Sequence, residues 1–321
     1  MKAAIRDKYG PPSVIQLVDL EKPTPSKGEL LIKVKACTVN RTDCAVLDGT
    51  PYIFRFFAGF PRPRKKVLGT DFAGIVEAIG EGVHKFKVGD RVFGFIDTGL
   101  SSYAEYMLIH EKEPIALIPE QTTYEDAAGS IEGFHYALNF INKINFSPNE
   151  KVLINGASGA IGSAMLQILS LKKLEIDIVC DTRSIPYLQK YQPNTIYDYQ
   201  KQDFTTLHKS YHYIVDAVGK STFFKCKHLL KPKGIYVSSE LGPWSQNILY
   251  ALFTPLFRGK KVIFPLPTKT QQSLNYASEL LSKKQFKPLI DKNISLKDLR
   301  ETFEYVNAGK KMGNVILRME H

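Results

Sequence analysis

The segment Asn155–Gly162, which reads Asn-Gly-Ala-Ser-Gly-Ala-Ile-Gly, constrains the fold of this 321-residue chain more than any other stretch. It follows the apolar run Lys151–Ile154, which predicts a buried strand, and it precedes Ser163–Leu169, whose apolar spacing predicts a helix. A strand, a glycine-rich turn and a helix form the unit that holds the pyrophosphate of a dinucleotide. The strict Gly-x-Gly-x-x-Gly pattern is broken here, because Ala157 stands at its first glycine.

The two glycines at the end of this segment have separate expected roles. Gly159 lets the backbone approach a pyrophosphate, and Gly162 lets the helix pack closely on the strand. The start of the helix then offers free N–H groups and the positive end of its dipole to the phosphates. The cofactor contacts predicted in this turn are Ser158, Gly159, Ala160, Ile161 and Gly162.

Strands alternate with helices for about a hundred residues after the turn, which indicates a doubly wound parallel sheet of the α/β class. The predicted strands are Lys151–Ile154, Ile176–Cys180, Thr195–Tyr197, Tyr213–Asp216, Gly234–Val237 and Lys261–Phe264. The predicted helices between them are Ser163–Lys172, Ile185–Lys190, Thr222–Leu230 and Asn247–Phe257.

The segments on either side of this sheet predict a second domain. Residues 1 to about 120 are β-rich, with glycine bends and proline-bearing loops that favour a small barrel-like fold. The tail carries two helical patterns, Gln271–Lys283 and Leu296–Asn307, and a strand pattern, Asn314–Met319. A finished six-stranded sheet has no place for this tail, so we expect it to return to the first domain. The predicted domains are 1–121 with 266–321, and 122–265.

The formal net charge of +11 raises the alternative of a nucleic-acid-binding surface. The lysines, however, are spread along the chain, and the densest cluster, Arg62–Lys66, lies in a proline-rich loop without stacking aromatics around it. We favour a solvated basic surface and expect no nucleic-acid partner.

Several features favour a cytoplasmic protein. The start, Met1–Arg6, carries charges within its short apolar run and lacks the apolar core of a signal peptide. No apolar stretch is long enough to span a bilayer. Cys37 and Cys44 are close enough in sequence to meet across a turn, but the four scattered cysteines include no Cys-x-x-Cys motif and are expected to be reduced thiols.

Motifs along the whole chain resemble the medium-chain dehydrogenase/reductase superfamily, in particular its zinc-independent quinone oxidoreductase branch. The matching segments are Asn40–Asp43, Gly69–Gly74, Val76–Gly80 with Gly82-Val83, Phe86–Gly94, Asn155–Gly162, Asp216–Gly219 and Lys311–Ile316. The resemblance implies a GroES-like domain built from the two ends of the chain and a Rossmann domain in the middle. It also implies a cofactor in the cleft between the domains and a homodimer.

The resemblance also bears on zinc. Where zinc alcohol dehydrogenases have a ligating cysteine this chain has Asn40, and where they have a His-Glu pair it has Thr70-Asp71. The four-cysteine lobe that holds their structural zinc is absent, and the histidines show no ligand spacing except His208 and His212, which we interpret as part of a surface turn. We therefore expect no metal. Without a Lewis acid to activate an alcohol, the natural reaction is reduction of an activated acceptor, a quinone or an enone.

The choice of nicotinamide cofactor rests on two residues with opposite preferences. Asp181 lies nineteen residues after Gly162, the spacing of the acid that binds the ribose of NAD, whereas Arg183 and Thr182 have the phosphate-binding character that suits NADP. Asp181 has an alternative role as a helix N-cap or part of a surface turn. We expect NADPH, with NADH as the alternative. By resemblance, Tyr199 contacts the adenine or the 2′-phosphate; the alternative is a surface aromatic residue after a strand.

Two further segments, Asp216–Gly219 and Ser238–Leu241, follow the carboxyl ends of predicted strands, where ligands gather in such sheets. They supply the predicted cofactor contacts Val218, Gly219 and Leu241, and the motif Lys311–Ile316 adds Asn314. The candidate catalytic residues are Asn40, which replaces a zinc ligand, and Tyr52, which either contacts the substrate or packs on its own domain. The aromatic loop that starts at Tyr52 forms either a pocket wall or a dimer or membrane-surface patch. His135 faces either the core or the cofactor, and we favour the core.

The sequence therefore predicts an NADPH-dependent reductase of quinones or enones. The alternative is a regulatory or structural protein that binds NADPH with little turnover and has some affinity for nucleic acid.

Overall fold

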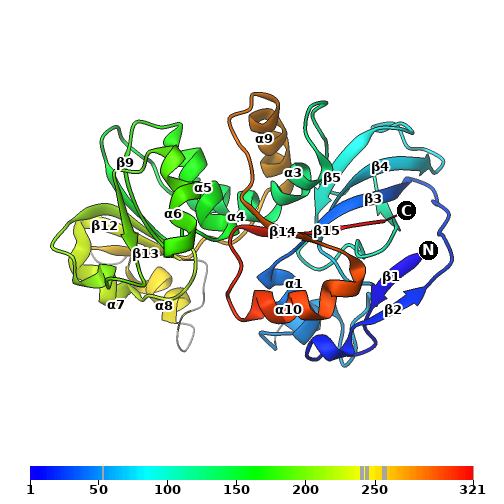
Figure 1. Ribbon diagram of the computed structural model, residues 1–321, viewed down its shortest axis with the longest axis horizontal. Coiled ribbons are helices and arrows are strands. Elements are labelled where there is room, and N and C mark those ends of the chain that lie inside the picture. Colours follow the sequence, from blue (N-terminus) through cyan, green and yellow to red (C-terminus); the bar gives the residue numbers. More distant parts are fainter. Residues whose placement is uncertain (53, 239–241, 243–245, 255–258, 321) are drawn as a thin grey trace. The chain divides into compact units, whose positions relative to one another are not determined.

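The computed structural model describes residues 1–321 except 53, 239–241, 243–245, 255–258 and 321 (Figure 1). The described chain forms two compact units, one of residues 1–132 and 269–321 and the other of residues 133–268. We call them the terminal unit and the central unit. The first junction lies later than the predicted one at 121/122, because α3 (Tyr124–Gly129) packs on strands of the terminal unit.

The central unit contains a six-stranded parallel sheet with the order β10-β9-β8-β11-β12-β13. Its strands are β8 (Lys151–Asn155), β9 (Glu175–Cys180), β10 (Thr195–Asp198), β11 (Tyr211–Asp216), β12 (Leu230–Ser238) and β13 (Lys261–Ile263). This is the strand order 3-2-1-4-5-6 of a Rossmann sheet, and all six predicted strands are present.

Helix α4 (Glu132–Ile141) leads into β8. The α-helices between the strands are α5 (Ala160–Ser170), α6 (Ile185–Leu188), α7 (Phe223–Cys226) and α8 (Gln246–Phe253), and β10 is joined to β11 by a segment with a single 3₁₀ turn, Phe204–Thr206. From the centre of the sheet, β8, β9 and β10 follow one another towards one edge, and β11, β12 and β13 follow one another towards the other edge. Since such crossovers are right-handed, the connections of the two halves cover opposite faces of the sheet. Because both faces of the sheet are covered, the central strand β8 is apolar: Val152, Leu153 and Ile154 are fully buried.

The terminal unit is built on a seven-stranded sheet with the order β14-β15-β3-β4-β5-β7, in which β6 also pairs with β3. The strands are β3 (Glu29–Val39), β4 (Asp71–Ile79), β5 (Arg91–Phe95), β6 (Tyr106–His110), β7 (Ile115–Leu117), β14 (Ile290–Ile294) and β15 (Asn314–Arg318), with a separate hairpin of β1 (Lys2–Ile5) and β2 (Gln16–Asp19). Its helices are α1 (Arg41–Asp48), α2 (Phe54–Ala58), α3, α9 (Thr270–Ser282) and α10 (Leu299–Asn307).

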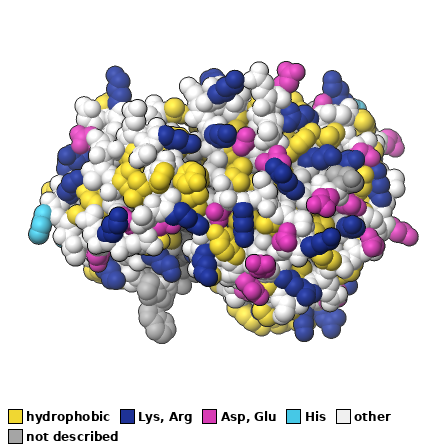
Figure 2. All heavy atoms as spheres, in the orientation of Figure 1, with side chains coloured by type: hydrophobic (Ala, Val, Ile, Leu, Met, Phe, Trp, Pro, Cys, Tyr) yellow, Lys and Arg dark blue, Asp and Glu magenta, His cyan; other side chains and the backbone are white. Residues whose placement is uncertain are grey.

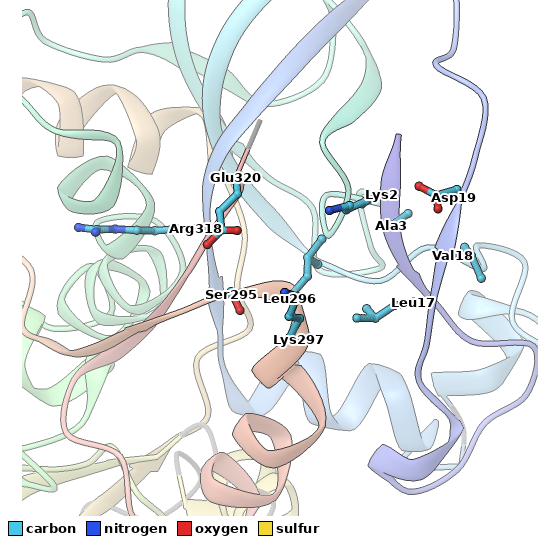
Figure 3. Close-up of a pocket in the computed structure, with 10 residues that line it drawn as sticks. All are labelled: Lys2, Ala3, Leu17, Val18, Asp19, Ser295, Leu296, Lys297, Arg318 and Glu320. Carbon is cyan, nitrogen blue, oxygen red and sulfur yellow. The ribbon is translucent and has the colours of Figure 1, made fainter.

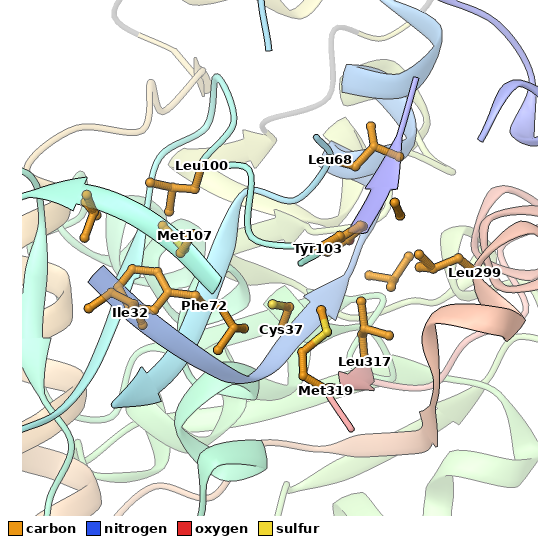
Figure 4. Packing of buried hydrophobic residues seen from close by; sticks show 14 of the residues in the cluster. Ile32, Cys37, Leu68, Phe72, Leu100, Tyr103, Met107, Leu299, Leu317 and Met319 are labelled. Atoms are coloured by element: carbon orange, nitrogen blue, oxygen red, sulfur yellow. The ribbon is translucent and has the colours of Figure 1, made fainter. Parts of the chain in front are cut away.

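Strand β3 organises this unit because it pairs with three other strands. One edge pairs with β4, and the other pairs first with β6 and then, from Ala36 to Val39, with β15. Side chains of β3, β4, β6, β15 and α10 meet in one apolar core, in which Phe72 and Tyr103 are fully buried (Figure 4). The predicted return of the tail to the first domain is confirmed by the β15–β3 pairing. Strand β14 was not predicted.

Candidate functional site

The glycine turn joins β8 to α5 in the central unit. Gly156 has φ of +86°, a conformation that glycine adopts without strain. The N–H groups of Gly156 and Ala157 both donate to the carbonyl oxygen of Val179 on β9, at 3.1 and 2.9 Å. Gly156 therefore makes the tight turn, one position before the place that the strict motif assigns to it. This explains how the chain accommodates Ala157, which is fully buried.

Gly159 and Gly162 differ in the space around them. A Cβ atom on Gly162 would lie 2.2 Å from the carbonyl oxygen of Gly156, so α5 can approach the turn only with glycine there. A Cβ atom on Gly159 would have a single neighbour, the same oxygen, at 3.5 Å. Gly159 is also the N-cap of α5 and has no side chain to cap it, so helix geometry leaves the first-turn N–H groups, from Ala160 to Gly162, without helical acceptors. The turn fits a pyrophosphate.

One of the predicted contacts after β11, Val218, lies beside this turn. A Cβ atom on Gly156 would come within 2.8 Å of the Cβ atom of Val218, so Val218 packs directly against the turn. Gly219 follows with φ of +67° and is exposed. The structure thus brings Val218 and the glycine turn together from strands that are far apart in sequence.

Asp216, the last residue of β11, holds this region in place. Its side chain is buried, and its two oxygens accept hydrogen bonds from Asn155 Nδ2, from the backbone N–H groups of Val218, Gly219 and Ser221, and from the hydroxyl of Tyr236. Burial raises the pKa of Asp216, while these donors oppose the rise. The carboxylate therefore braces the loop and is not free to contact a ligand.

The residues expected at the adenosine ribose follow β9. Asp181 Oδ1 accepts from the backbone N–H of Ser184 at 3.0 Å and caps a short 3₁₀ turn, while Oδ2 lies 4.0 Å from Nε of Arg183. The side chain of Arg183 is 51% exposed, against 18% for Asp181. Thr182 donates its hydroxyl proton to Asp198 at the end of β10. The alternative role of Asp181 as a cap is therefore present, and the guanidinium is the more accessible of the two charges.

Other predicted residues have varied settings. Tyr199 follows β10 and is 55% exposed. Leu241 lies outside the described residues. Asn314 begins β15 in the terminal unit, where its Nδ2 donates to the carbonyl oxygens of Gly129 and Leu289, both at 3.1 Å. His135 is buried, as we favoured, and burial lowers its pKa to about 4.

Asn40, in the terminal unit, belongs to a series of polar side chains that are joined by hydrogen bonds. Lys311 Nζ donates to Asn40 Oδ1 at 2.5 Å and to the carbonyl oxygen of Gly313 at 2.8 Å. Asn40 Nδ2 donates to the hydroxyl oxygen of Thr38 at 2.7 Å. Thr38 in turn donates its hydroxyl proton to Asp71 Oδ2, and its backbone N–H donates to Oδ1 at 2.7 Å. We call Lys311, Asn40, Thr38 and Asp71 the polar relay.

Asp43 and Thr70 lie next to the relay. Asp43 accepts from the backbone N–H of Asn40 at 2.9 Å and from the hydroxyl of Thr70 at 3.0 Å. Burial raises the pKa of Asp43 to about 6, and it raises the pKa of Asp71 well above its usual value, with the charge of Asp43 adding to the rise. The residues at the positions of the zinc ligands in zinc alcohol dehydrogenases are thus all hydrogen-bonded within the terminal unit: Asn40 to Lys311 and Thr38, Thr70 to Asp43, and Asp71 to Thr38.

Glu132 is a further buried acid in this unit. Its side chain is 6% exposed; Oε1 accepts from the hydroxyl of Thr42 at 2.7 Å, and Oε2 is buried without a partner among the described residues. Burial and the charge of Asp43 raise the pKa of Glu132 to about 8, while Lys311 and the Thr42 bond oppose the rise. Sequence reasoning missed Glu132, Thr38 and Lys311 as site residues. The available signal for Glu132 was an acid within an otherwise uncharged stretch, between Ile131 and Phe134.

Tyr52, the second candidate catalytic residue, belongs to an exposed aromatic group. It is 59% exposed, its ring meets that of Phe60 edge-on at 6.4 Å, and the guanidinium of Arg55 lies 4.4 Å from its ring centre. Among the described residues, no hydrogen bond joins Tyr52 to the polar relay.

Two pockets lie away from these residues. One, of about 210 Å³, is formed in the terminal unit by β1, β2, the segment before α10 and the end of β15 (Figure 3). The other, of about 530 Å³, lies at the amino ends of the central strands, where Lys151, Glu175 and Tyr211 line it. Neither contains a predicted site residue.

The surface and the helices bear on possible partners. On the face shown in Figure 2, Lys and Arg side chains are scattered among Asp and Glu and form no continuous basic tract. None of the described helices has both the length and the apolar character to cross a bilayer. Among the described residues, no three His, Cys, Asp or Glu side chains are arranged to hold a metal ion.

Two families match this chain. The alcohol dehydrogenase GroES-like domain matches residues 26–120, and the family described as zinc-binding dehydrogenase matches residues 194–317. The first match falls within the terminal unit. The second begins in the central unit and extends through the tail to β15.

Quinone oxidoreductases from several organisms are similar to this chain, some over its whole length and others over about half of it. A chloroplastic quinone-oxidoreductase, QR1, from Triphysaria versicolor is 27% identical over 99% of this chain and 98% of its own length. A quinone oxidoreductase from Sus scrofa is 37% identical over 53% of this chain and 49% of its own length. The structure of the quinone oxidoreductase from Coxiella burnetii has a TM-score of 0.86 at 23% identity, covering 100% of this chain and 99% of that one, and supports the fold.

Proposed function

Because this chain is an oxidoreductase that belongs to the medium-chain dehydrogenase/reductase superfamily, in its quinone oxidoreductase-like branch, we propose that it transfers a hydride from NADPH to a quinone or an α,β-unsaturated carbonyl. The observation that carries this proposal is the glycine turn. Its open Gly159 and the free N–H groups at the start of α5 suit a dinucleotide pyrophosphate.

The preference for NADPH over NADH rests on the end of β9. Asp181 already accepts a hydrogen bond from Ser184 and lies near Arg183, whereas the guanidinium of Arg183 is half exposed. Arginine can donate two parallel hydrogen bonds to a phosphate, which suits the 2′-phosphate of NADPH. Thr182 and Tyr199 complete the proposed adenosine end.

We propose that the reaction needs no zinc, and the donor set supports this. A catalytic zinc takes three nitrogen, sulfur or carboxylate ligands. Asn40 and Thr70 stand at two of the three corresponding positions, and both oxygens of Asp71, at the third, accept hydrogen bonds from Thr38. These residues do not fit the metal.

The chemistry then divides simply between the cofactor and the chain. The dihydronicotinamide supplies the hydride when it is bound. The chain has to orient the acceptor, exclude water and stabilise the negative charge that develops on the acceptor oxygen. Asn40 and Tyr52 remain our candidates for contact with the acceptor.

We further propose a homodimer that forms through the β13 edge of the central sheet. Among the described strands, β13 pairs only with β12, so its other edge is open to a second copy. Helix α8 packs near β13 and exposes Leu249, Leu252 and Phe253, the last two by 65% and 57%. The double variant Leu252→Ser/Phe253→Ser should turn a dimer into a monomer in analytical ultracentrifugation. A wild-type monomer would contradict the proposal.

We place the protein in a reducing compartment and propose the cytoplasm. All four cysteines are buried and unpaired, as expected of thiols that are kept reduced. No nucleic-acid partner is proposed.

The function is tested by following oxidation of NADPH, and separately of NADH, with simple quinones and enones in the absence of oxygen. We expect saturable turnover with NADPH and identification of the hydroquinone or saturated carbonyl as product. Tight NADPH binding without turnover would instead identify a regulatory or structural NADPH-binding protein. Absence of binding to either dinucleotide would refute the oxidoreductase assignment of the site.

A further inference from the structure

The proton that must accompany the hydride has no assigned source in the proposed reaction. Reduction of a quinone to a hydroquinone, or of an enone to a saturated carbonyl, consumes one hydride and one proton. The inference below rests on the proposed function and concerns that proton.

The polar relay fixes the direction of every hydrogen bond along it. Lys311 can only donate, so the atom of the Asn40 amide that it contacts must be the oxygen. The amide nitrogen of Asn40 then faces Thr38, whose own proton is directed at Asp71. The orientation of the Asn40 amide is therefore set by a cation at one end and an acid at the other.

These contacts leave one N–H bond of Asn40 and one of Lys311 without a partner among the described residues. Nδ2 of Asn40 has two N–H bonds, and Thr38 takes one of them. The ammonium group of Lys311 has three N–H bonds, of which Asn40 and the carbonyl of Gly313 take two. Lys311 is partly exposed. The ammonium group therefore lies beside the candidate residue Asn40 and has one N–H bond left to donate.

We propose that Lys311 is the acid of the reaction: its ammonium group binds the acceptor oxygen beside Asn40 and supplies the proton. Hydride addition leaves a hydroquinone monoanion or an enolate on the substrate. One N–H bond of Lys311 then breaks and an O–H bond forms, and an enol product rearranges to the carbonyl. The neutral amine regains its proton from water. The ammonium group takes the place of the zinc ion of the zinc alcohol dehydrogenases as the positive charge at the acceptor oxygen, beside Asn40, which corresponds to one of the zinc ligands.

The charges around Lys311 suit this role. Burial lowers the pKa of Lys311, which makes it a stronger acid, while the charges of Glu132, Cys44, Asp43 and Asp291 act in the opposite direction. Asp291, on β14, is itself held by the hydroxyl of Tyr305 at 2.6 Å and the backbone N–H of Met312 at 3.2 Å. These charges oppose the effect of burial, and among the described residues no carboxylate lies within 4.0 Å of the ammonium group.

The first test uses binding alone and needs no turnover. Spectroscopic titration with 4-nitrophenol, whose phenolate absorbs visible light, reports the charge of an oxygen ligand. The wild-type protein loaded with the oxidised dinucleotide should bind the phenolate and lower the apparent pKa of the phenol. The Lys311→Met variant should lose this preference, and Lys311→Arg should retain it because arginine keeps the charge.

The second test separates charge from proton donation. Arginine does not give up its proton, so Lys311→Arg should bind phenolate normally yet lose kcat roughly 100-fold or more, as should Lys311→Met. The wild-type kcat should fall at high pH and show a solvent deuterium isotope effect. In Lys311→Arg and Lys311→Met, the pH dependence of kcat and the isotope effect should both be absent. Lys310→Met, the same change at the exposed neighbouring lysine, is the matched control and should behave like the wild type.

The outcomes distinguish this inference from the proposed function. A wild-type protein that binds no dinucleotide or reduces no acceptor refutes the function. Wild-type turnover with an unchanged kcat and pH profile in Lys311→Met, in protein that unfolds at the wild-type temperature, overturns the role of Lys311 alone.

Discussion

The hydroxyl of Thr42 donates to Oε1 of Glu132 at 2.7 Å, and this is the single hydrogen bond that the described structure gives to the buried carboxyl of Glu132. Thr42 belongs to the first turn of α1, and Glu132 begins α4, 90 residues later. The bond ties two segments of the terminal unit together through a group that burial penalises when it is charged.

Glu132 should make stability depend on pH. Burial raises its pKa in the folded state to about 8, above the ordinary value of 4.5, so the folded state holds a proton that the unfolded state releases. This contribution is fully present below about pH 4.5 and is lost as pH rises towards 8. We expect the free energy of unfolding of the wild type, relative to Glu132→Gln, to fall by ~1–3 kcal/mol over this range. Urea denaturation at several pH values measures it. Glu304→Gln, an exposed change on α10, is the control, and a constant difference would contradict the prediction.

The glycine turn predicts opposite effects for two alanine substitutions. Gly162→Ala places a Cβ atom 2.2 Å from the Gly156 oxygen and should cost about 1–3 kcal/mol of stability. Gly159→Ala meets no atom closer than 3.5 Å, at a φ of −79° that alanine accepts, so the fold should tolerate it. The added methyl should instead weaken NADPH binding about tenfold, or ~1.4 kcal/mol. Denaturation and calorimetric titration of both variants separate the two effects, and equal stability losses would refute this division of roles.

Arg183 and Asp181 should shift cofactor preference in opposite directions. Arg183→Ala removes donors to the 2′-phosphate and should weaken NADPH roughly 10- to 100-fold while leaving NADH within about twofold. Asp181→Ser keeps an acceptor for the N–H of Ser184 and removes a charge that repels the phosphate, so NADPH should bind more tightly. Calorimetry with both dinucleotides checks the pair. Lys172→Ala, just beyond the other end of α5, is the matched control for loss of a positive charge. Stronger NADPH binding by Arg183→Ala would identify Asp181 as the residue that sets specificity.

Asp216 should be needed for the shape of the loop after β11. Asp216→Asn retains one acceptor oxygen for a set of donors that now use two, and should cost roughly 2–3 kcal/mol of stability. Tyr236→Phe removes a single donor at 2.8 Å and should cost about 1 kcal/mol. Because Val218 packs against the glycine turn, Asp216→Asn should also weaken dinucleotide binding, and Tyr236→Phe should weaken it less. Thermal unfolding with and without NADPH tests both, and an Asp216→Asn variant of wild-type stability would contradict the bracing role.

Local sequence patterns were sufficient for the central sheet. Each strand there is a short apolar run between turns, and one glycine segment marks the start of the dinucleotide-binding unit. The terminal unit was harder to predict, because β3 pairs with β15 across most of the chain and β14, with Lys292 and Asn293 in it, is too polar to read as a buried strand.

The residues of the candidate site also differ in whether local sequence could predict them. Gly156, Val218 and Asp216 lie at strand ends and could be expected near the cofactor from strand position alone. The Lys311–Asn40 hydrogen bond joins residues 271 positions apart, and no periodicity or spacing encodes such a pairing. Burial also gave Asn314 and Asp216 structural hydrogen bonds that their motifs do not reveal.

The pairing of β15 with β3 has a consequence for biosynthesis. The central unit is one continuous stretch, residues 133–268, and can fold on the ribosome as soon as that stretch has emerged. The terminal unit cannot, since Ala36–Val39 of β3 gains its partner only when Asn314–Arg318 has been translated. Until then an apolar strand edge stays open in the nascent chain, so chaperone dependence and aggregation during synthesis should be concentrated at the part of the protein that is made first and completed last.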